Sequence, residues 1–356
     1  MRDNRRRRAD LQSYRSARRI PSAASPAHLS GMTQHNPRRV FMLGATGTIG
    51  RATVRALAAR GHEVVCFGRP RADAPALPPG VSMRHGDVQD PASLSRDGFR
   101  GERFDAVVSC MASRTGTPRD AWAIDHQAHQ HVLHAARAAG VTHMVLLSAI
   151  CVQKPLLPFQ HAKLAFERAL MDSGLTWTIV RPTAFFKSLA GQVARVQRGK
   201  PFLMFGTGTL TACKPISDDD LAAFIADSLT DPTRHNRILP IGGPGPAQTP
   251  REQGEQLFAL LGRPARFTQV PVALLDVIIA VLTVAGRVVP SLADKAQLAR
   301  IGRYYATESM LVWDAAAQRY DADATPSTGT DTLADFYAKR LRGDIADDRG
   351  EHAVFQ

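Results

Sequence analysis

A short apolar run at 40–43 leads directly into three glycines, Gly44, Gly47 and Gly50, spaced as G-x-x-G-x-x-G. A helical pattern of apolar residues begins at once after them, and a second apolar run follows at 63–67. The order strand, glycine turn, helix, strand is the unit that places the diphosphate of a dinucleotide at a helix N-terminus. Glycine suits each of the three positions, because it has no side chain. The first allows a tight turn, the second lets the backbone approach phosphate, and the third lets the helix pack closely on the strand. The loop therefore predicts a dinucleotide-binding protein.

The residues of this loop are expected to contact the cofactor directly. They are Gly44, Thr46, Gly47, Thr48, Ile49 and Gly50. The second predicted strand ends in Gly68-Arg69-Pro70-Arg71, where NAD-selective folds carry an acidic side chain for the ribose hydroxyls. Arginine suits a 2′-phosphate instead, so Arg69 and Arg71 predict NADPH as the cofactor. The alternative is that both arginines are ordinary loop charges.

Four more apolar runs predict an α/β fold, namely a Rossmann-type doubly wound parallel sheet with a smaller C-terminal substrate lobe. The runs are 81–88, 104–109, 143–148 and 175–182. Ligands of such sheets lie at the carboxyl ends of the strands, so four further residues are predicted to bind the cofactor. They are Asp87, Val88, Cys110 and Ala112. Asp87 has an equal alternative as the cap of a helix that starts at Pro91.

Composition narrows the function classes. The chain has 356 residues, 44% of them hydrophobic, which is enough for a large core. Of the net charge of +13, ten arginines and two aspartates give residues 1–39 a charge of +8, which leaves +5 for the rest. A mildly basic body fits small anionic ligands, and no nucleic-acid partner is expected. The four cysteines form no C-x-x-C pair, which excludes the usual zinc and iron–sulfur patterns, so no metal is predicted.

The chain is expected to divide into four parts. They are a disordered basic leader at 1–37, an NADP-binding Rossmann domain at 38–235, a substrate lobe at 236–340 that also uses 184–215, and a disordered tail at 341–356. Met32, which stands just before the first predicted strand, is expected to be the physiological start, and the alternative is that the Arg- and Ser-rich leader is an organellar transit peptide. The expected location is the cytoplasm, with membrane association as a further possibility, and a plastid only if the leader is a transit peptide.

Two polar clusters are expected to be structural. Four histidines occur on the helix predicted over 118–139, namely His126, His129, His131 and His134. They do not share one face and have no acidic or cysteine partner at a consistent spacing, so a solvated helix surface is predicted. Asp218 or Asp219 is expected to cap a helix that runs through Leu229.

The stretch after the fifth predicted strand resembles the short-chain dehydrogenase/reductase superfamily. In that superfamily a serine follows this strand, and Tyr-x-x-x-Lys opens the next helix. Ser148 and Lys163 match this pattern, whereas Phe159 stands at the position of the tyrosine. The family's tyrosine protonates a carbonyl oxygen as hydride arrives. The resemblance therefore implies a member that is not a routine ketone reductase, alcohol dehydrogenase or sugar epimerase.

Longer strings resemble narrower groups. The atypical NmrA-like and isoflavone-reductase-like branch of the superfamily is resembled by two stretches, 179–182 and 216–222. Four longer strings resemble the NADPH-dependent 3,8-divinyl (proto)chlorophyllide 8-vinyl reductases. They are 109–116, 159–167, 181–188 and 303–311. This second resemblance spans about 39–337.

The resemblance implies a reaction. An 8-vinyl group on a magnesium tetrapyrrole, divinyl chlorophyllide or protochlorophyllide, is reduced to ethyl by hydride from NADPH and a solvent-derived proton. Phe159 is consistent with it, because the resulting charge is spread over a macrocycle and a tyrosine aimed at an oxyanion would have no target. Lys163 is implied to anchor the nicotinamide ribose and to support proton delivery, and Ser148 is implied to be its catalytic companion.

A large, flat and mostly apolar substrate with a propionate tail needs an apolar slot with a cation at its rim. The candidates are Phe159, Phe185, Phe186, Lys187, Arg303, Tyr304, Tyr305 and Met310. Plain core packing of the aromatics is an equal alternative. The apolar stretch at 274–284 is expected to be a buried helix of the lobe, and the alternative is a peripheral contact with a membrane that holds pigment intermediates.

Two other functions fit part of the pattern. One is an ene-reductase that acts on a smaller conjugated substrate. The other is a non-catalytic NADP(H)-sensing regulator like NmrA, which would keep the glycine loop and tolerate Phe159. The string at 303–311 favours the pigment reductase, because a sensor has no need for it.

Overall fold

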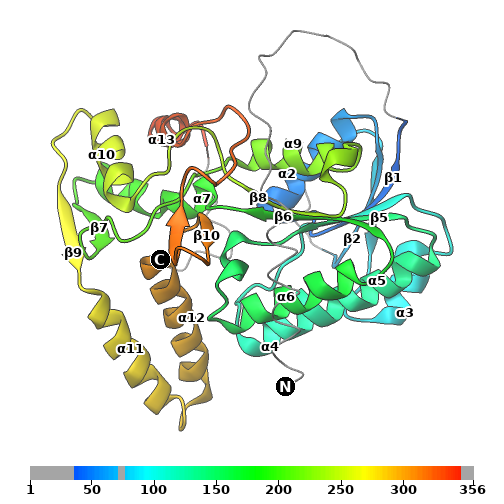
Figure 1. The fold of residues 1–356 in the computed structure, drawn as a ribbon, viewed down its shortest axis with the longest axis horizontal. Helices are drawn as coiled ribbons and strands as arrows, with labels where there is room; N and C mark the ends of the chain where they lie inside the picture. The colour runs from blue at the N-terminus through cyan, green and yellow to red at the C-terminus, as the bar shows by residue number, and fades with distance from the viewer. Residues whose placement is uncertain (1–35, 71–76, 346–356) are drawn as a thin grey trace. The chain divides into compact units, whose positions relative to one another are not determined.

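Seven parallel strands form one sheet in the order β3-β2-β1-β4-β5-β6-β8 (Figure 1). The computed structural model describes residues 36–70 and 77–345. The strands are β1 (Arg39–Leu43), β2 (Glu63–Gly68), β3 (Val81–His85), β4 (Ala106–Ser109), β5 (His143–Leu147), β6 (Thr176–Pro182) and β8 (Arg237–Ile241). The chain order reverses at β1, between β2 and β4, which is the switch point where open α/β sheets bind ligands. The predicted Rossmann-type sheet is confirmed.

Helices cover both faces of the sheet, as Figure 1 shows. One face carries α2 (Thr48–Ala59) and α9 (Asp218–Asp227), and the other carries α3 (Pro91–Ser93), α5 (His129–Ala138) and α6 (Pro158–Met171). Val40 and Met42 pack toward the first face, whereas Phe41 and Leu43 pack toward the second. All four side chains are fully buried. A strand covered on both faces is apolar at every position, which is why the run at 40–43 does not alternate.

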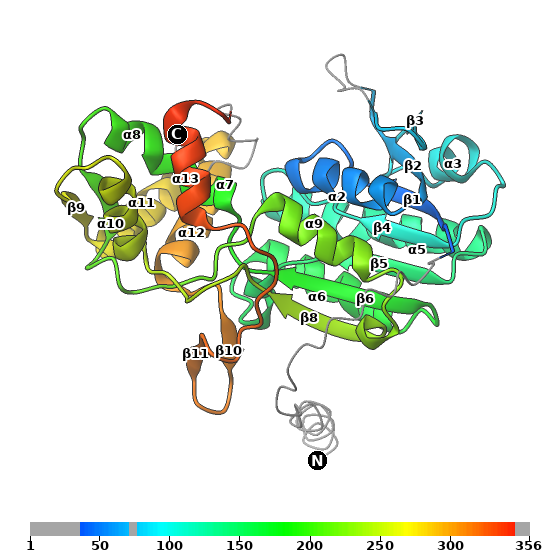
Figure 2. The same ribbon diagram turned by 90° about the horizontal axis from the view of Figure 1, so that it is seen from above.

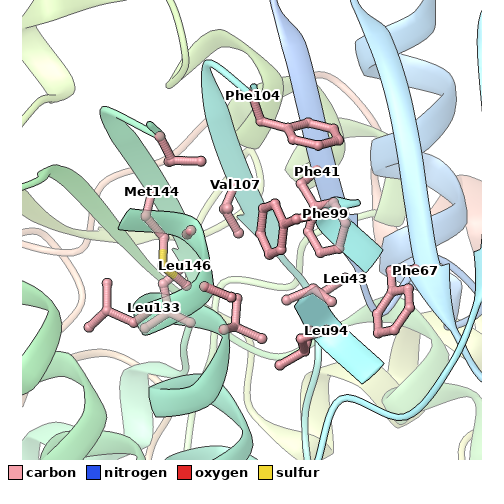
Figure 3. Packing of buried hydrophobic residues seen from close by; sticks show 14 of the residues in the cluster. Phe41, Leu43, Phe67, Leu94, Phe99, Phe104, Val107, Leu133, Met144 and Leu146 are labelled. Atoms are coloured by element: carbon pink, nitrogen blue, oxygen red, sulfur yellow. The ribbon is translucent and has the colours of Figure 1, made fainter. Parts of the chain in front are cut away.

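Aromatic rings fill the core beneath β1 on the α5 side (Figure 3). The ring of Phe41 stacks on that of Phe99 with a centroid distance of 4.1 Å, and the ring of Phe104 meets it edge-on at 5.3 Å. Leu94 and Phe67 complete this layer. The layer anchors the strand that ends in the glycine loop.

The helix predicted over 118–139 is interrupted in the structure. It consists of α4 (Pro118–Ala121), a π-helical turn η2 (Trp122–Ala128) and α5. The segment after β6 is also divided, into α7 (Phe186–Leu189), a 3-10 turn η4 (Ala190–Gln192) and α8 (Val193–Gln197). A π-helical turn rotates the side chains that follow it, and such turns occur often at functional sites.

The cap of α9 differs from the prediction. The Ser217 hydroxyl accepts a hydrogen bond from the backbone N–H of Asp220 at 3.0 Å, and Asp218 is already the first helical residue. The prediction that Asp218 or Asp219 caps this helix is therefore wrong. The aspartates instead occupy the first turn, where negative charge is favourable.

A second group of elements lies beside the sheet (Figure 2). It contains α8, α10 (Pro250–Leu260), α13 (Leu333–Arg342) and the parallel pair β7 (Phe202–Phe205) and β9 (Phe267–Val270). Its core includes Phe186, Phe202, Phe258 and Tyr337. The main sheet extends past the predicted domain end at 235, because β8 pairs with β6.

The two remaining long helices, α11 (Val272–Ala285) and α12 (Pro290–Thr307), form a hairpin (Figure 1). Only Leu275 of α11 is buried, so the prediction of a buried helix at 274–284 is wrong. The reason is that α12 covers one side of α11 and leaves the other side open. Within the described residues, no helix combines the length and the apolar character needed to cross a membrane.

Candidate active site

The glycine loop has the geometry of a phosphate cradle. Gly44 has φ +73°, and a Cβ there would lie 2.5 Å from the Cys110 carbonyl carbon. A Cβ on Gly50 would lie 1.9 Å from the Gly44 oxygen, so neither position accepts a side chain. Gly47 is exposed, and a Cβ on it would meet only the Gly44 oxygen at 3.5 Å. The loop thus leaves open space at Gly47, beside the N-terminus of α2, and a diphosphate fits this arrangement.

The segment after β4 lies against this loop. The Cys110 backbone is the nearest neighbour of Gly44, and the Cys110 thiol lies 3.6 Å from the Thr53 hydroxyl on α2. Burial raises the pKa of Cys110 to about 12, so the thiol is neutral and unreactive. Ala112, two residues further on, is exposed. The structure therefore places Cys110 and Met111 against the glycine loop, and Ala112 follows them directly.

The outer cofactor candidates follow β2 and β3. Arg69 is exposed directly after β2, whereas Arg71 lies outside the described residues. Asp87 is exposed, and its side chain accepts the backbone N–H of Gln89 at 2.9 Å. Asp90, not Asp87, caps α3 by accepting the N–H of Ala92 at 2.9 Å, so the capping alternative for Asp87 is wrong. Val88, the remaining candidate, packs at the edge of the aromatic core.

Lys163, on α6, forms an ion pair that the sequence did not predict. Its Nζ lies 2.9 Å from Oδ1 of Asp125, whose carboxylate is fully buried in the π-helical turn η2. The Ser113 backbone N–H and hydroxyl donate to the same carboxylate at 3.1 and 2.6 Å. Burial acts to raise the pKa of Asp125, but Lys163 and Ser113 outweigh it and the pKa lies below its usual range. Asp125 is therefore ionised, and its carboxylate holds the Lys163 ammonium in place.

A small cavity adjoins this pair. Its lining includes Asp125, His129, Ser148 and Lys163. The Nδ1 of His129 donates to the Ile124 carbonyl at 2.8 Å, which leaves Nε2 to accept from the Ser109 hydroxyl at 2.8 Å. Burial lowers the pKa of His129 to about 4, so the ring is neutral at pH 7. The prediction that this histidine belongs to a solvated surface is wrong, because the π-helical turn directs it inward.

Ser148 follows β5 as predicted, but its hydroxyl is engaged. It donates to Oε1 of Glu167 at 2.5 Å, and Glu167 also pairs with Arg181 of β6 through Nε at 3.1 Å. Both Ser148 and Glu167 are buried. Ser148 thus hydrogen-bonds to the buried Glu167, which joins α6 to β6 through its ion pair with Arg181.

Half of the eight substrate candidates are core residues, and these four belong to two different hydrophobic clusters. Phe159, Tyr304 and Met310 are 8%, 4% and 9% exposed and share one hydrophobic cluster. The Tyr304 hydroxyl shares its proton between the carbonyls of Cys151 and Lys154 at 3.0 and 3.2 Å, which fixes α12 against the turn that follows β5. Core packing, the alternative stated for the aromatics, describes these positions.

The other candidates are scattered. Phe186 lies in the core of the lobe, and Phe185 is half-buried beside α9. Arg303 pairs with Asp276 of α11, and Tyr305 is 41% exposed on α12. Lys187 contacts neither α11 nor α12 in any hydrogen bond described here; its Nζ donates to the Thr48 hydroxyl of the glycine loop at 2.7 Å.

Asp125 was missed at the sequence level, although its position gave a signal. Ala121, Asp125, Ala128 and Val132 recur at helical spacing and are all buried. A carboxylate on the buried face of a helix requires a cationic partner.

Among the described residues, no group of three or more histidine, cysteine, aspartate or glutamate side chains is arranged to hold a metal ion.

Comparisons with known proteins agree with this geometry. The model of a family described as NAD(P)H-binding matches residues 44–232. The solved NADPH-dependent quinone oxidoreductase QOR2 of Escherichia coli, in complex with NADPH, superposes with a TM-score of 0.60 and 20% identity, over 85% of this chain and 99% of that chain. At this identity the likeness shows the fold alone.

Two curated plant relatives are much more similar. The chloroplastic divinyl chlorophyllide a 8-vinyl-reductase of Oryza sativa subsp. indica is 48% identical, over 94% of this chain and 86% of its own. The protein of the same name from Zea mays is 47% identical, over 94% and 87%. The identity extends through the sheet, the glycine loop and the lobe. The chain belongs to the divinyl chlorophyllide a 8-vinyl-reductase family.

Proposed function

We propose that this chain reduces the 8-vinyl group of divinyl chlorophyllide or protochlorophyllide to ethyl, with NADPH as the hydride donor. The observation that carries the proposal is the 48% identity with a named 8-vinyl reductase over 94% of the chain. The structure adds physical support, because the glycine cradle follows β1 and Lys163 lies beside the carboxyl end of β5, two strands along the same edge of the sheet.

The cofactor is assigned to the switch point of the sheet. The backbone of Gly47 and the first turn of α2 are proposed to hold its diphosphate, and the exposed Arg69 its 2′-phosphate. The segment at 110–112 is proposed to flank it on the side of β4. NADPH supplies the hydride, and the protein's part is to fix the position of the donor.

Phe159 and Lys163 together suit reduction of a conjugated vinyl group. Phe159 has no proton to donate and is almost fully buried, so an oxyanion would find no acid at this position. Lys163 carries three N–H donors, of which Asp125 engages one. We propose that the others hold the nicotinamide ribose and relay the solvent proton that completes the ethyl group.

The proposed reaction has a direct test. Purified protein, NADPH and divinyl chlorophyllide are mixed, and the Soret band is followed. A blue shift is expected, because loss of the vinyl group shortens the conjugated system. An unshifted band, with NADPH still bound by the protein, would point to the NADP(H)-sensing alternative.

Lys163→Ala should lower kcat in this assay by about 100-fold, the lower limit for loss of a proton-transfer group. The KM for NADPH should rise as well, because a ribose contact is lost. Lys200→Ala is the control, since Lys200 is exposed on the loop before β7. If Lys163→Ala kept a near-normal kcat and KM for NADPH, neither role could stand.

Arg69→Ala should raise the KM for NADPH by about 10-fold or more and leave that for NADH within about 2-fold, because only NADPH carries the 2′-phosphate. Steady-state kinetics with both cofactors measure this, and Arg119→Ala, at an exposed position on α4, is the control. Equal KM values for NADPH and NADH in the unmodified protein would contradict the 2′-phosphate assignment.

We also propose a peripheral membrane contact through α11. Val277, Val281 and Val284 are 58%, 61% and 60% exposed along one side of this helix, and Val288 is 84% exposed at the tip of the hairpin. Each valine that enters a bilayer gains about 1.5 kcal/mol. The hairpin also carries more basic than acidic residues, which favours an anionic surface.

Val277→Asp combined with Val281→Asp should abolish flotation with vesicles of phosphatidylcholine and phosphatidylglycerol, whereas the unmodified protein should float. Leu156→Asp is the control, because Leu156 is 62% exposed outside the hairpin. Sedimentation shows whether α11 instead joins two copies. A dimer that stays with the soluble fraction would contradict the membrane contact.

A further inference from the structure

Helix α6 carries three residues at four-residue spacing along one side, namely Phe159, Lys163 and Glu167. Side chains four residues apart follow one another along the same face of a helix. All three are largely buried, and Glu167 is only 1% exposed. This face of α6 therefore combines a ring without a hydroxyl, a cation and a buried anion.

Glu167 is bound through both of its carboxylate oxygens. Arg181 of β6 donates to Oε1 through Nε at 3.1 Å, and to Oε2 through a terminal guanidinium nitrogen. A guanidinium is always charged and only donates, so this two-point pairing identifies Glu167 as an ionised carboxylate. A carboxylate that is buried so completely needs such a partner.

The Ser148 hydroxyl donates to the same carboxylate, with its oxygen 2.5 Å from Oε1 of Glu167. An ionised carboxylate only accepts hydrogen bonds, so the direction of this bond is fixed. A hydroxyl has one proton, and Glu167 takes it. Because hydrogen bonds to a carboxylate are stronger than those to a neutral oxygen, a substrate carbonyl would compete poorly for this proton.

Ser148 nevertheless borders the site. Together with Lys163 it lines the cavity beside the carboxyl end of β5, which has a volume of about 10 Å³. Its backbone N–H donates to the Val180 carbonyl of β6 at 2.8 Å, so the residue is fixed at this edge of the sheet. The position of Ser148 thus suits contact with a substrate, whereas its proton is directed to Glu167.

We propose that Glu167 is a specificity-determining residue: it holds the Ser148 hydroxyl away from the substrate, so that this position, like Phe159, offers no proton to a carbonyl oxygen. Glu167 acts through Ser148 and not on the substrate, so its role is one of positioning. The inference rests on the proposed reduction of a vinyl group, whose transition state needs no such donor, and it replaces the expectation that Ser148 is a catalytic companion of Lys163.

The first test is Ser148→Ala in the Soret assay. Its kcat should stay within about 3-fold of the unmodified protein, whereas loss of a donor to an oxyanion costs about 100-fold or more. Its Tm should fall, because Glu167 loses a hydrogen bond. Ser228→Ala is the matched control, since Ser228 is a fully buried serine that follows α9 and donates to the Phe224 carbonyl at 2.8 Å. The same pattern is expected for both variants.

The second test releases the Ser148 hydroxyl. Glu167→Met combined with Arg181→Met removes both charges, and hydrophobic replacement of a buried ion pair often preserves stability. Made together with Phe159→Tyr, this change gives the site two hydroxyls that can donate to an oxygen. The ratio of acetophenone reduction to vinyl reduction, both with NADPH, should rise about 10-fold or more over that of Phe159→Tyr alone. Addition of Ser148→Ala should cancel the rise.

Three results would overturn the proposal. One is a loss of about 100-fold in kcat for Ser148→Ala with an unchanged circular dichroism spectrum. Another is an unchanged ratio in the second test, because a purely structural Glu167 would affect both activities in proportion. The third is a rise in the ratio that survives Ser148→Ala, which would mean that Glu167 does not act through Ser148.

Two further measurements keep the outcome decisive. If the variant without the ion pair failed to fold, Glu167→Gln in the Phe159→Tyr background would replace it, since a neutral amide holds the hydroxyl less strongly than a carboxylate does. The same rise, cancelled by Ser148→Ala, is expected. An unshifted Soret band with the unmodified protein would contradict the proposed reaction, and the rate of acetophenone reduction in the same variants would then decide the role of Glu167 by itself.

Discussion

The contact between Gly50 and the Gly44 carbonyl is the constraint on which the site depends. A Cβ on Gly50 would lie 1.9 Å from that oxygen, so α2 can begin so close to β1 only because the residue is glycine. Gly44 in turn packs on the Cys110 backbone, which ties the loop to the segment after β4. The two contacts fix the crevice at the switch point. Lys187 of α7 reaches this loop at Thr48, and Lys163 of α6 is joined to the segment after β4 through Asp125 and Ser113.

Local patterns predicted the sheet because each strand carries its own signal. The buried strands are apolar at every position, and the glycine spacing marks the turn from β1 into α2. The π-helical turn at Trp122–Ala128 has no such signal, since it inserts no proline or glycine into the helical pattern. The exposure of α11 could not be predicted either, because an apolar helix looks the same whether or not another element covers it.

The site likewise has a part that local sequence patterns predicted and a part that they did not. The glycine loop and the position of Lys163 followed from spacing and resemblance, and the structure brings the loop and the segment at 110–112 together. The partners of the charged side chains did not follow, because ion pairs such as Lys163 with Asp125 depend on tertiary packing. The aromatic candidates show the limit most clearly: Phe159 and Tyr304 carry the family pattern, yet their rings fill the core between α6 and α12.

The pairing of Lys163 with Asp125 also bears on the chemistry. A lysine ammonium beside a phenol would lower the pKa of the phenol and prepare it to give a proton to a single oxygen. Here the phenol position holds Phe159, and the Asp125 carboxylate compensates the lysine charge at 2.9 Å. Little net charge is therefore concentrated where an oxyanion would form. Such a site would not stabilise the oxyanion that forms from a carbonyl substrate. It suits a transition state whose charge is spread over a conjugated ring, because that charge needs no single strong donor.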